Sequence, residues 1–588
     1  MKDRKAPRER QQQDPESETW ERLPWRKLEQ HVYRIQKHIF RAERAGKTRV
    51  VQKLQKLLLK SEAARLLAVR RVTQENQGKK TAGIDGVKAV KPAERIALAE
   101  HIHPKHWGQE KPQPVRRVYI PKPGKLEKRP LGIPTIYERA KQCLVKAALE
   151  PEWEAKFEPN SYGFRPGRSC HDAIEAIFND IRFQPKYVLD ADITGCFDHI
   201  SHEPLLQKLH AIPMVQQTIK QWLRAGVMEE EVFFPTNSGT PQGGTISPLL
   251  ANIALHGMEE ATQKAFTTRE GKPHVVRYAD DFLVFHKTQQ GVEKAKVVVE
   301  NWVQEMGLTL KPSKTRITHT SEGFDFLGFT IQQYPVGKTH SGKHPNGSLL
   351  GFKTIIKPSK EARTRHLQAI AERCKQLRAA SQEQLIKALN PIIRGWSNYY
   401  RTVVSKEVFA DCDHQVYQLT HRWAKHKHAN KGVQWRQSKY WGKEVGEQST
   451  FQTRDGVKLR KHRDTAIKRH TKVRGTASPY DGKRVYWAQR LKNHPMTRET
   501  VVRLLQKQNG TCKWCGLTFT EEDRIEIDHI QPRSQGGSNR LDNKAALHLH
   551  CHDQRHGIHD KDSSTEEPCA SKGASTVLQT SAGGDSCA

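Results

Sequence analysis

The chain has 588 residues, too many for one ordinary hydrophobic core, so several domains are expected. Lysine and arginine total 99 against 64 aspartate and glutamate residues, and the resulting net charge of +35 favours nucleic acid as the partner. No apolar run is long enough to span a bilayer and no secretory signal begins at Met1, which argues against a membrane or secreted protein. The sequence predicts a protein of the cytoplasm of a bacterial-type cell, or of an organelle interior.

Residues 1–60 form a charged, helix-prone segment. Trp20, Trp25 and Tyr33 stand among many basic residues, a mixture typical either of a solvated helical face or of phosphate contact with base stacking. The leucines at 57–59 belong to an amphipathic stretch that is expected to pack on the next domain. We therefore predict a basic helical extension.

Residues 116–135, RRVYIPKPGKLEKRPLGIPT, predict a basic β-hairpin. Val118 and Ile120 alternate as in a strand, the prolines and glycine that follow force a turn, and residues 129–133 return. A hairpin of this kind can close over a triphosphate. A charged surface hairpin is the alternative.

Two stretches rich in glycine follow. Residues 162–169, YGFRPGRS, predict a rigid, tightly turned segment whose Arg165 and Arg168 contact a nucleic-acid backbone. Residues 238–253, SGTPQGGTISPLLANI, predict a loop before an apolar helix, where glycine allows a template or nucleotide to approach the backbone.

Two acidic stretches carry the central chemical prediction. In residues 187–200, YVLDADITGCFDHI, an apolar strand ends near Asp192, and in residues 274–285, HVVRYADDFLVF, two short strands bend at Asp280 and Asp281. Three converging carboxylates repel one another unless cations neutralise them, and hard oxygen ligands suit Mg²⁺. Two such ions would activate a primer 3′ oxygen and stabilise the departing pyrophosphate.

At these residues the sequence resembles reverse transcriptases. Asp192 matches the catalytic aspartate of their first palm motif, and Tyr278-Ala279-Asp280-Asp281 matches their second. The resemblance implies that Phe197 is the steric gate that favours deoxynucleotides, and that Gln242 contacts the nucleotide or primer backbone.

The basic hairpin resembles the finger motif of the reverse transcriptases encoded in group II introns. This implies triphosphate contacts for Lys122 and Arg129. Lys314 matches a lysine proposed to protonate pyrophosphate, although a solvated lysine is as plausible.

Residues 356–429 show a helical pattern, with one helix expected to end near Asn390-Pro391. The stretch IRGWSNYYR, residues 393–401, resembles the thumb or maturase X domain of group II intron proteins, and its aromatic residues at helical spacing are expected in a core. Residues 454–474 carry many basic side chains, which predicts either a DNA-binding region or an exposed charged linker.

The last constellation begins at the CxxC pair Cys512 and Cys515, which with His548 and Cys551 predicts a tetrahedral Zn²⁺ site. His556 is an alternative to His548 as the fourth ligand. The other cysteines are expected to be reduced thiols rather than members of a disulfide framework.

The residues beside this site resemble HNH, or ββα-metal, nucleases: Asp528 and His529 end a predicted strand, Asn543 opens a helix, and His552 lies further along. The resemblance implies that His529 is the general base, that Asp528 and His552 bind Mg²⁺ or another divalent ion, and that Asn543 orients the imidazole. A purely structural zinc ribbon that holds DNA is the alternative.

Together these stretches resemble a group II intron-encoded protein that is a reverse transcriptase, a maturase and a nuclease. The expected fold is multidomain α+β, with right-hand polymerase-like fingers and palm, an α-helical thumb, a basic DNA-binding region and a small zinc-stapled HNH module. The expected boundaries are a helical extension at 1–60, fingers and palm at 61–345, thumb at 346–430, DNA-binding region at 431–504, HNH domain at 505–560 and a disordered tail at 561–588.

The resemblance implies binding of the intron RNA, assistance to splicing, nicking of the second strand of target DNA, and target-primed cDNA synthesis from dNTPs on an RNA template with a DNA primer. Two alternatives stay open: a stand-alone or defence-associated reverse transcriptase, and a domesticated RNA-binding splicing factor.

Overall fold

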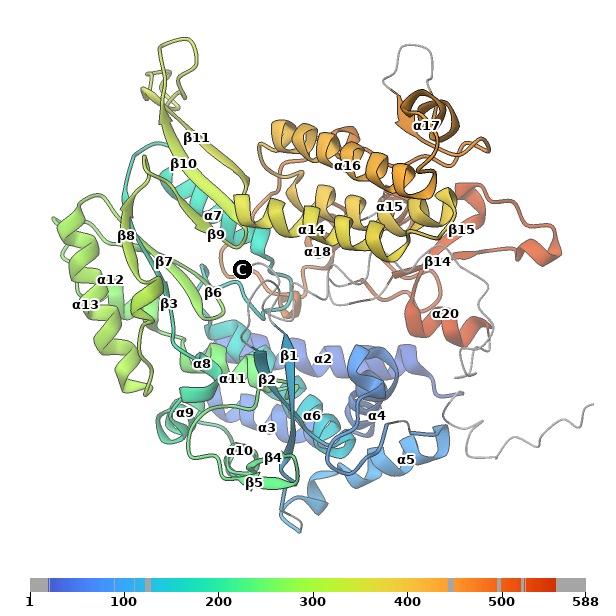
Figure 1. Cartoon of the computed structure of the whole chain (residues 1–588). Helices are drawn as coiled ribbons and strands as arrows, with labels where there is room; N and C mark the ends of the chain where they lie inside the picture. The colour runs from blue at the N-terminus through green and yellow to red at the C-terminus, as the bar shows by residue number, and fades with distance from the viewer. Residues whose placement is uncertain are drawn as a thin grey trace, which may run out of the picture.

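The computed structural model describes residues 20–556, apart from residues 21, 89, 110, 122–127, 443–448, 494–496, 498, 520–522 and 524. Lys122, the first 19 residues and the predicted disordered tail therefore lie outside the described residues. In Figure 1 the N-terminal helices lie below a central sheet, a helical layer lies above it, and the C-terminal module lies beside both.

Four N-terminal helices pack together around apolar stripes. In α2 (Trp25–Arg44), buried side chains at Val32, Ile35 and Ile39 recur at the three- and four-residue spacing of one helix face. The other members are α3 (Thr48–Lys60), α4 (Glu62–Arg70) and α6 (Ile136–Lys156), and α5 (Pro92–His101) packs on α4.

These helices share one hydrophobic core with the central sheet, and that core runs from Trp20 to Leu310. The expected boundary at residue 60 therefore falls inside a single core. Trp20 and Trp25 are buried in it, so these two rings support packing and not base stacking.

A four-stranded sheet with the order β2-β1-β4-β5 contains the predicted basic hairpin. Its strands β1 (Val115–Pro121) and β2 (Lys128–Ile133) are antiparallel, with Ile120 opposite Arg129, which confirms the hairpin. The remaining strands are β4 (Val227–Glu229) and β5 (Val232–Phe234).

The central sheet has the antiparallel order β6-β7-β3-β8. Its strands are β3 (Tyr187–Asp192), β6 (His274–Tyr278), β7 (Asp281–His286) and β8 (Arg316–His319). The strands β6 and β7 form the predicted acidic hairpin. Helices around this sheet and its loops are α7 (Cys170–Ile181), α8 (Cys196–His199), α9 (His202–Leu209), α10 (Pro213–Leu223), α11 (Ser247–Ala254), α12 (Met258–Lys264) and α13 (Gln289–Glu305).

A three-stranded sheet leads into the upper helical layer of Figure 1. Its strands are β9 (Phe324–Phe326), β10 (Phe329–Pro335) and β11 (Phe352–Pro358), and the helices that follow are α14 (Lys360–Gln376), α15 (Gln382–Tyr400), α16 (Lys406–Lys427) and α17 (Val433–Tyr440). The predicted helix end near Asn390 is wrong, because α15 continues through Pro391. Its Trp396 stacks on His366 and its Tyr400 is buried, so the predicted core role of these rings is confirmed.

The region expected to be a DNA-binding segment or exposed linker is partly folded onto the central sheet's helix α7. Asp172 of α7 is fully buried, and its carboxylate lies 3.0 Å from Nε2 of His470 and accepts a hydrogen bond from Arg490 at 2.5 Å. Arg490 belongs to α18 (Arg484–Asn493). Residues 470–490 are therefore anchored by a buried carboxylate, which is not the behaviour of an exposed linker.

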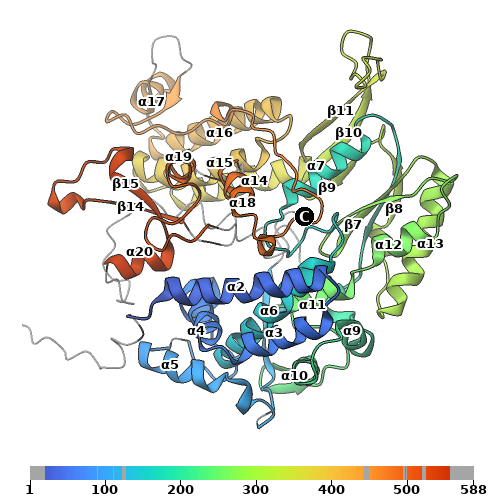
Figure 2. The same cartoon turned by 180° about the vertical axis from the view of Figure 1, so that it is seen from behind.

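The C-terminal module comprises α19 (Glu499–Lys507), β14 (Ile525–His529), β15 (Lys544–His548) and α20 (Leu549–His556), and a small β-ladder of β12 (Trp441–Gly442) and β13 (Thr450–Phe451) precedes it. The module contacts the N-terminal helices, since Nε2 of His550 lies 3.0 Å from Oε1 of Glu29. Beside this contact, Arg70 of α4 forms ion pairs with both Glu29 and Glu75. Figure 2 shows this packing from behind. None of the described helices is long and apolar enough to cross a membrane.

Candidate functional sites

The acidic hairpin turns sharply between β6 and β7. Tyr278 pairs with Asp281, which leaves Ala279 and Asp280 at the turn, and Ala279 adopts a positive φ of 56°. Asp281 is in turn the direct cross-strand partner of Asp192 at the end of β3. The fold thus brings all three predicted carboxylates to one end of the central sheet.

The environment of these carboxylates disfavours negative charge. Burial and the neighbouring Asp192 raise the pKa of the Asp280 carboxyl. Burial and the charges of Asp280 and Asp192 raise the pKa of the Asp281 carboxyl well above its ordinary value. A group of acids that is hard to ionise without a counter-charge is a candidate cation site.

Lys314 supplies one positive charge at this site. Its Nζ lies 2.6 Å from Oδ2 of Asp192. Within the described part of the chain, the carboxylate oxygens of Asp192, Asp280 and Asp281 do not all lie within 4.8 Å of one another. The ammonium of Lys314 occupies the Asp192 side of the site. Asp190, two residues before Asp192 on β3, forms an ion pair with Arg316 at 3.1 Å.

Three predicted substrate-contacting residues fall within the described part of the chain, namely Arg129, Phe197 and Gln242. The positive charge of Arg129 on β2 acts on Asp280. The side-chain amide of Gln242 donates a hydrogen bond to the carboxylate of Asp198 at 3.3 Å. Its main-chain carbonyl accepts a hydrogen bond from the main-chain amide of Gly132 on β2 at 2.5 Å. The ring of Phe197 lies edge-on to that of Phe164, with centroids 5.9 Å apart.

A buried brace behind the hairpin is absent from the sequence prediction. Arg277 is 2% exposed, and its guanidinium donates to Oδ1 of Asn252 at 2.9 Å and to the carbonyl of Ala279 at 3.1 Å. Asn252 donates to the carbonyl of Gly163 at 2.8 Å. A Cβ added to Gly163 would lie 2.3 Å from the amide nitrogen of Ala279, so only glycine fits there. In the sequence, the arginine just before the acidic turn was the one indication of this brace.

The expectation that Arg165 and Arg168 contact nucleic acid is wrong. Arg165 is buried and pairs with Glu154 at 2.8 Å, and it also donates to nearby backbone carbonyls. Arg168 is buried as well and donates to the carbonyls of Pro159 and Gly475. Burial leaves neither guanidinium group access to a phosphate. Their hydrogen bonds within the protein show that both groups stabilise the fold.

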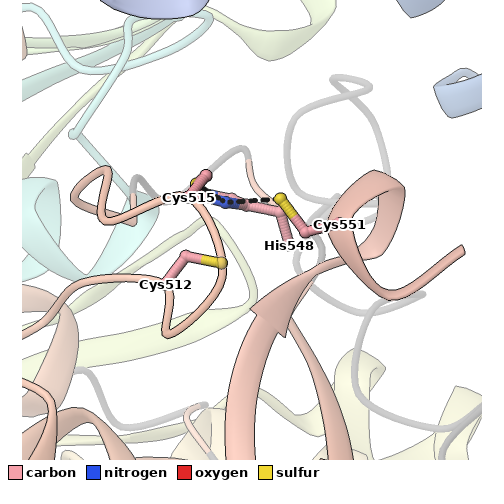
Figure 3. Close-up of side chains that lie close together, drawn as sticks. All are labelled: Cys512, Cys515, His548 and Cys551. Atoms are coloured by element: carbon pink, nitrogen blue, oxygen red, sulfur yellow. Dashed lines mark hydrogen bonds between the residues drawn. The ribbon is translucent and has the colours of Figure 1, made fainter. Parts of the chain in front are cut away.

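In the C-terminal module, Cys512, Cys515, His548 and Cys551 form a buried group whose ligand atoms all lie within 4.8 Å of one another. Figure 3 shows the His548 ring between the sulfurs of Cys515 and Cys551, at 3.2 and 3.9 Å from its Nδ1. On the other side of the ring, Nε2 lies 3.5 Å from Asp523. Hydrogen bonding with Cys515 and Cys551 lowers the pKa of the Cys512 thiol. Three thiols and an imidazole held by a carboxylate could hold a metal ion.

A second group in the module joins Asp528, His552 and His556. Nε2 of His556 lies 2.9 Å from Oδ2 of Asp528, and the two histidine rings lie 4.7 Å apart. Of the two histidines left open as a fourth ligand, His548 lies with the cysteines and His556 lies with Asp528. The missed signal was the four-residue spacing of His552 and His556 on one helix face.

His529 and Asn543 lie beside this second group, with one difference from the prediction. Asn543 does not open a helix but directly precedes β15. Its amide donates to the carbonyls of Gln531 and Ser538, so it fixes the loop that follows His529. The sequence predicted that Asn543 orients the imidazole of His529. In the structure, Nε2 of His529 lies 3.3 Å from Oδ1 of Asn539.

Four family models match the chain in order. They are the N-terminal domain of reverse transcriptase at residues 20–102, reverse transcriptase (RNA-dependent DNA polymerase) at 120–331, the group II intron maturase-specific domain at 363–441 and the HNH endonuclease at 512–557.

Three relatives each match part of the chain. Protein YkfC of Escherichia coli (strain K12) is 33% identical over 48% of this chain and 83% of its own length. Group II intron-encoded protein LtrA of Lactococcus lactis subsp. cremoris is 32% identical over 42% of this chain, and the match covers 52% of that relative. Maturase-like protein 1 of Euglena gracilis is 28% identical over 64% of this chain and 76% of its own length.

The domain order and the acidic hairpin define a reverse transcriptase joined to a maturase domain and an HNH module. The chain belongs to the group II intron-encoded reverse transcriptase and maturase family.

Proposed function

We propose that this protein binds its intron RNA, assists splicing, and copies the intron into DNA at a target site whose second strand its HNH module nicks. The observation that carries the polymerase part is the cross-strand pairing of Asp192 with Asp281, beside Asp280. In this proposal the β1–β2 hairpin is the fingers, the central sheet is the palm, and α14 to α16 are the thumb.

In the palm, Asp192, Asp280 and Asp281 would hold Mg²⁺. Bound there, two divalent ions supply Lewis-acid stabilisation of the attacking and leaving oxygens. The chain's own residues do the positioning. The three carboxylates are preorganised at one sheet end, with the turn of Ala279 held by Arg277.

Substrate contacts complete the palm. Arg129 and Lys122 would contact the triphosphate of the incoming dNTP, and Gln242 the backbone of nucleotide or primer. Phe197 would exclude a ribose 2′-hydroxyl. The electrostatic influence of Arg129 on Asp280 supports placing the triphosphate between β2 and the acidic turn.

In the HNH module, Asp528, His552 and His556 would hold one divalent ion, Mg²⁺ or another, which supplies charge stabilisation to the scissile phosphate. His529 would take the proton from the attacking water, since it lies next to Asp528 on β14 and outside the ligand group. Asn543 would act by fixing the loop after His529.

The group of Cys512, Cys515, His548 and Cys551 would hold a structural Zn²⁺. Its donor set, three thiols and an imidazole, is that of closed tetrahedral zinc sites, and it leaves no position for substrate. We place the protein inside a bacterial-type cell or organelle, where such thiols stay reduced.

The polymerase assignment is tested with Asp280→Asn and Asp281→Asn in full-length protein. Primer extension on an RNA template should fall at least about 100-fold, while RNA affinity stays within about 2-fold of the parent. Extension at the parental rate by the double variant would overturn the assignment. A stand-alone reverse transcriptase would extend primers normally and show no preference for intron RNA over a shuffled RNA of equal length.

The nuclease assignment is tested with His529→Ala. Nicking of target DNA should be lost and primer extension retained. If both activities were lost together, His529 would have a folding role instead.

A further inference from the structure

The outer end of the maturase-specific domain carries a connected series of aromatic rings whose two end members, Tyr417 and Trp435, are exposed, while Tyr440 and Trp441 between them are buried. The described part of this region includes the end of α16 and all of α17, and three of its apolar side chains are exposed: Tyr417 at 41%, Val433 at 62% and Trp435 at 37%. Ring contacts of 4.0 to 6.4 Å link Trp435 to Tyr417 through four further rings, those of His428, Tyr440, Trp441 and His421.

The same region is uniformly basic. Residues 414–442 contain no aspartate or glutamate but carry the basic side chains Arg422, Lys425, Lys427, Lys431, Arg436 and Lys439. Two of these flank the exposed indole, with Nζ of Lys439 at 4.8 Å and Nζ of Lys431 at 5.5 Å from its centroid. An exposed ring between two ammonium groups offers a stacking surface for a base and positive charge for its phosphates.

This surface is separate from the acidic hairpin. In Figures 1 and 2, which view the molecule from opposite sides, α17 lies at the outer end of the helical layer and away from β6 and β7. A ligand on this surface is therefore not the reacting primer end.

We propose that the surface formed by Lys431, Trp435 and Lys439 at α17 binds single-stranded RNA, with an unpaired base stacked on Trp435. The stacking requirement favours single strands, because the faces of paired bases are covered by their neighbours. The choice of RNA rests on the proposed function, since this surface lies at the end of the group II intron maturase-specific domain. An acidic peptide could use the lysines but would gain little from the ring.

The experiment measures binding of full-length protein to three fluorescent probes: a short unstructured RNA, DNA of the same sequence, and the RNA as a duplex. Trp435→Ala should weaken binding of the single-stranded RNA by about 10-fold, and Trp435→Phe should keep most of the affinity. Lys431→Gln with Lys439→Gln should reduce the salt slope for this probe by about 1.4. Trp514→Ala is the matched control, because Trp514 is 50% exposed in the C-terminal module, and it should bind like the parent.

Unchanged affinity of Trp435→Ala, an equal loss for the DNA or duplex probe, or an equal loss in Trp514→Ala would each overturn the proposal. The polymerase assignment fails separately. Asp280→Asn should retain Trp435-dependent binding of the RNA probe. Persistent extension by the aspartate variants would overturn only the proposed polymerase site.

Discussion

Asp192 and Asp281 are direct cross-strand partners on β3 and β7, so two carboxylates face the same end of the central sheet. Asp280, at the turn, adds a third negative charge, which helps to raise the pKa of the Asp281 carboxyl. Strand register therefore creates an electrostatic conflict that a cation relieves.

This conflict predicts how magnesium affects stability. With a chelator present, the melting temperature of Asp281→Asn should be at least that of the parent, because the variant lacks one buried carboxylate that repels its neighbours. Full relief of this repulsion would raise the melting temperature by about 2 °C. Added Mg²⁺ should raise the melting temperature of the parent more than that of the variant. Equal Mg²⁺-induced shifts in thermal melts of both proteins would contradict the cation site.

The brace behind the hairpin predicts an effect of Gly163→Ala. The added Cβ would lie 2.3 Å from the amide nitrogen of Ala279, so the acidic turn must move. We expect kcat for primer extension to fall about 10-fold or more with RNA affinity preserved, because small displacements of catalytic groups are costly. Gly337→Ala is the matched control, since a Cβ there meets nothing within 4 Å. Equal rates for the two variants would show that the turn tolerates the contact.

The two candidate metal-binding groups of the C-terminal module predict different losses if they hold the ions proposed for them. Cys515→Ser should release the zinc measured by metal analysis, make the module sensitive to protease and abolish nicking, because a closed structural site supports folding. His556→Ala should abolish nicking but retain the zinc and the protease resistance. Loss of zinc in His556→Ala would mean that the groups are not independent. Primer extension should survive in both variants.

Glu259 predicts a pH dependence of stability. Burial raises the pKa of its carboxyl to about 7, with the charge of Glu158 adding to the effect and the hydrogen bond from Asn160 opposing it. The folded state therefore holds a proton that the unfolded chain releases near pH 4.5, and stability falls as pH rises from about 4.5 to 7. Glu259→Gln, which keeps the shape without the titration, should be more stable than the parent at pH 8 by on the order of 1–3 kcal/mol.

Urea unfolding at pH 5 and pH 8 checks this prediction. The parent should lose stability between the two values and the variant should lose less. Parallel changes in parent and variant would place the relevant titration elsewhere.

The sequence by itself determined the local elements and the order of the domains. The acidic hairpin, the basic β1–β2 hairpin and the two-residue gaps of Cys512–Cys515 and His548–Cys551 follow from short-range patterns, since strand alternation and ligand spacing are properties of neighbouring residues. That His548 rather than His556 lies with the cysteines is seen only in the fold. The expected helix end at Asn390 failed because packing of α15 outweighs the local preference of Pro391.

The tertiary structure alone decided the partners of polar side chains. Arg165 and Arg168 look like phosphate ligands in a basic sequence, yet the fold buries them against Glu154 and backbone carbonyls. His556 joins Asp528, and Asp172 meets His470 and Arg490, because distant segments pack side by side. Local chemistry states what a side chain can bind, but a buried charge must find its compensation in three dimensions, and no sequence spacing specifies which distant group supplies it.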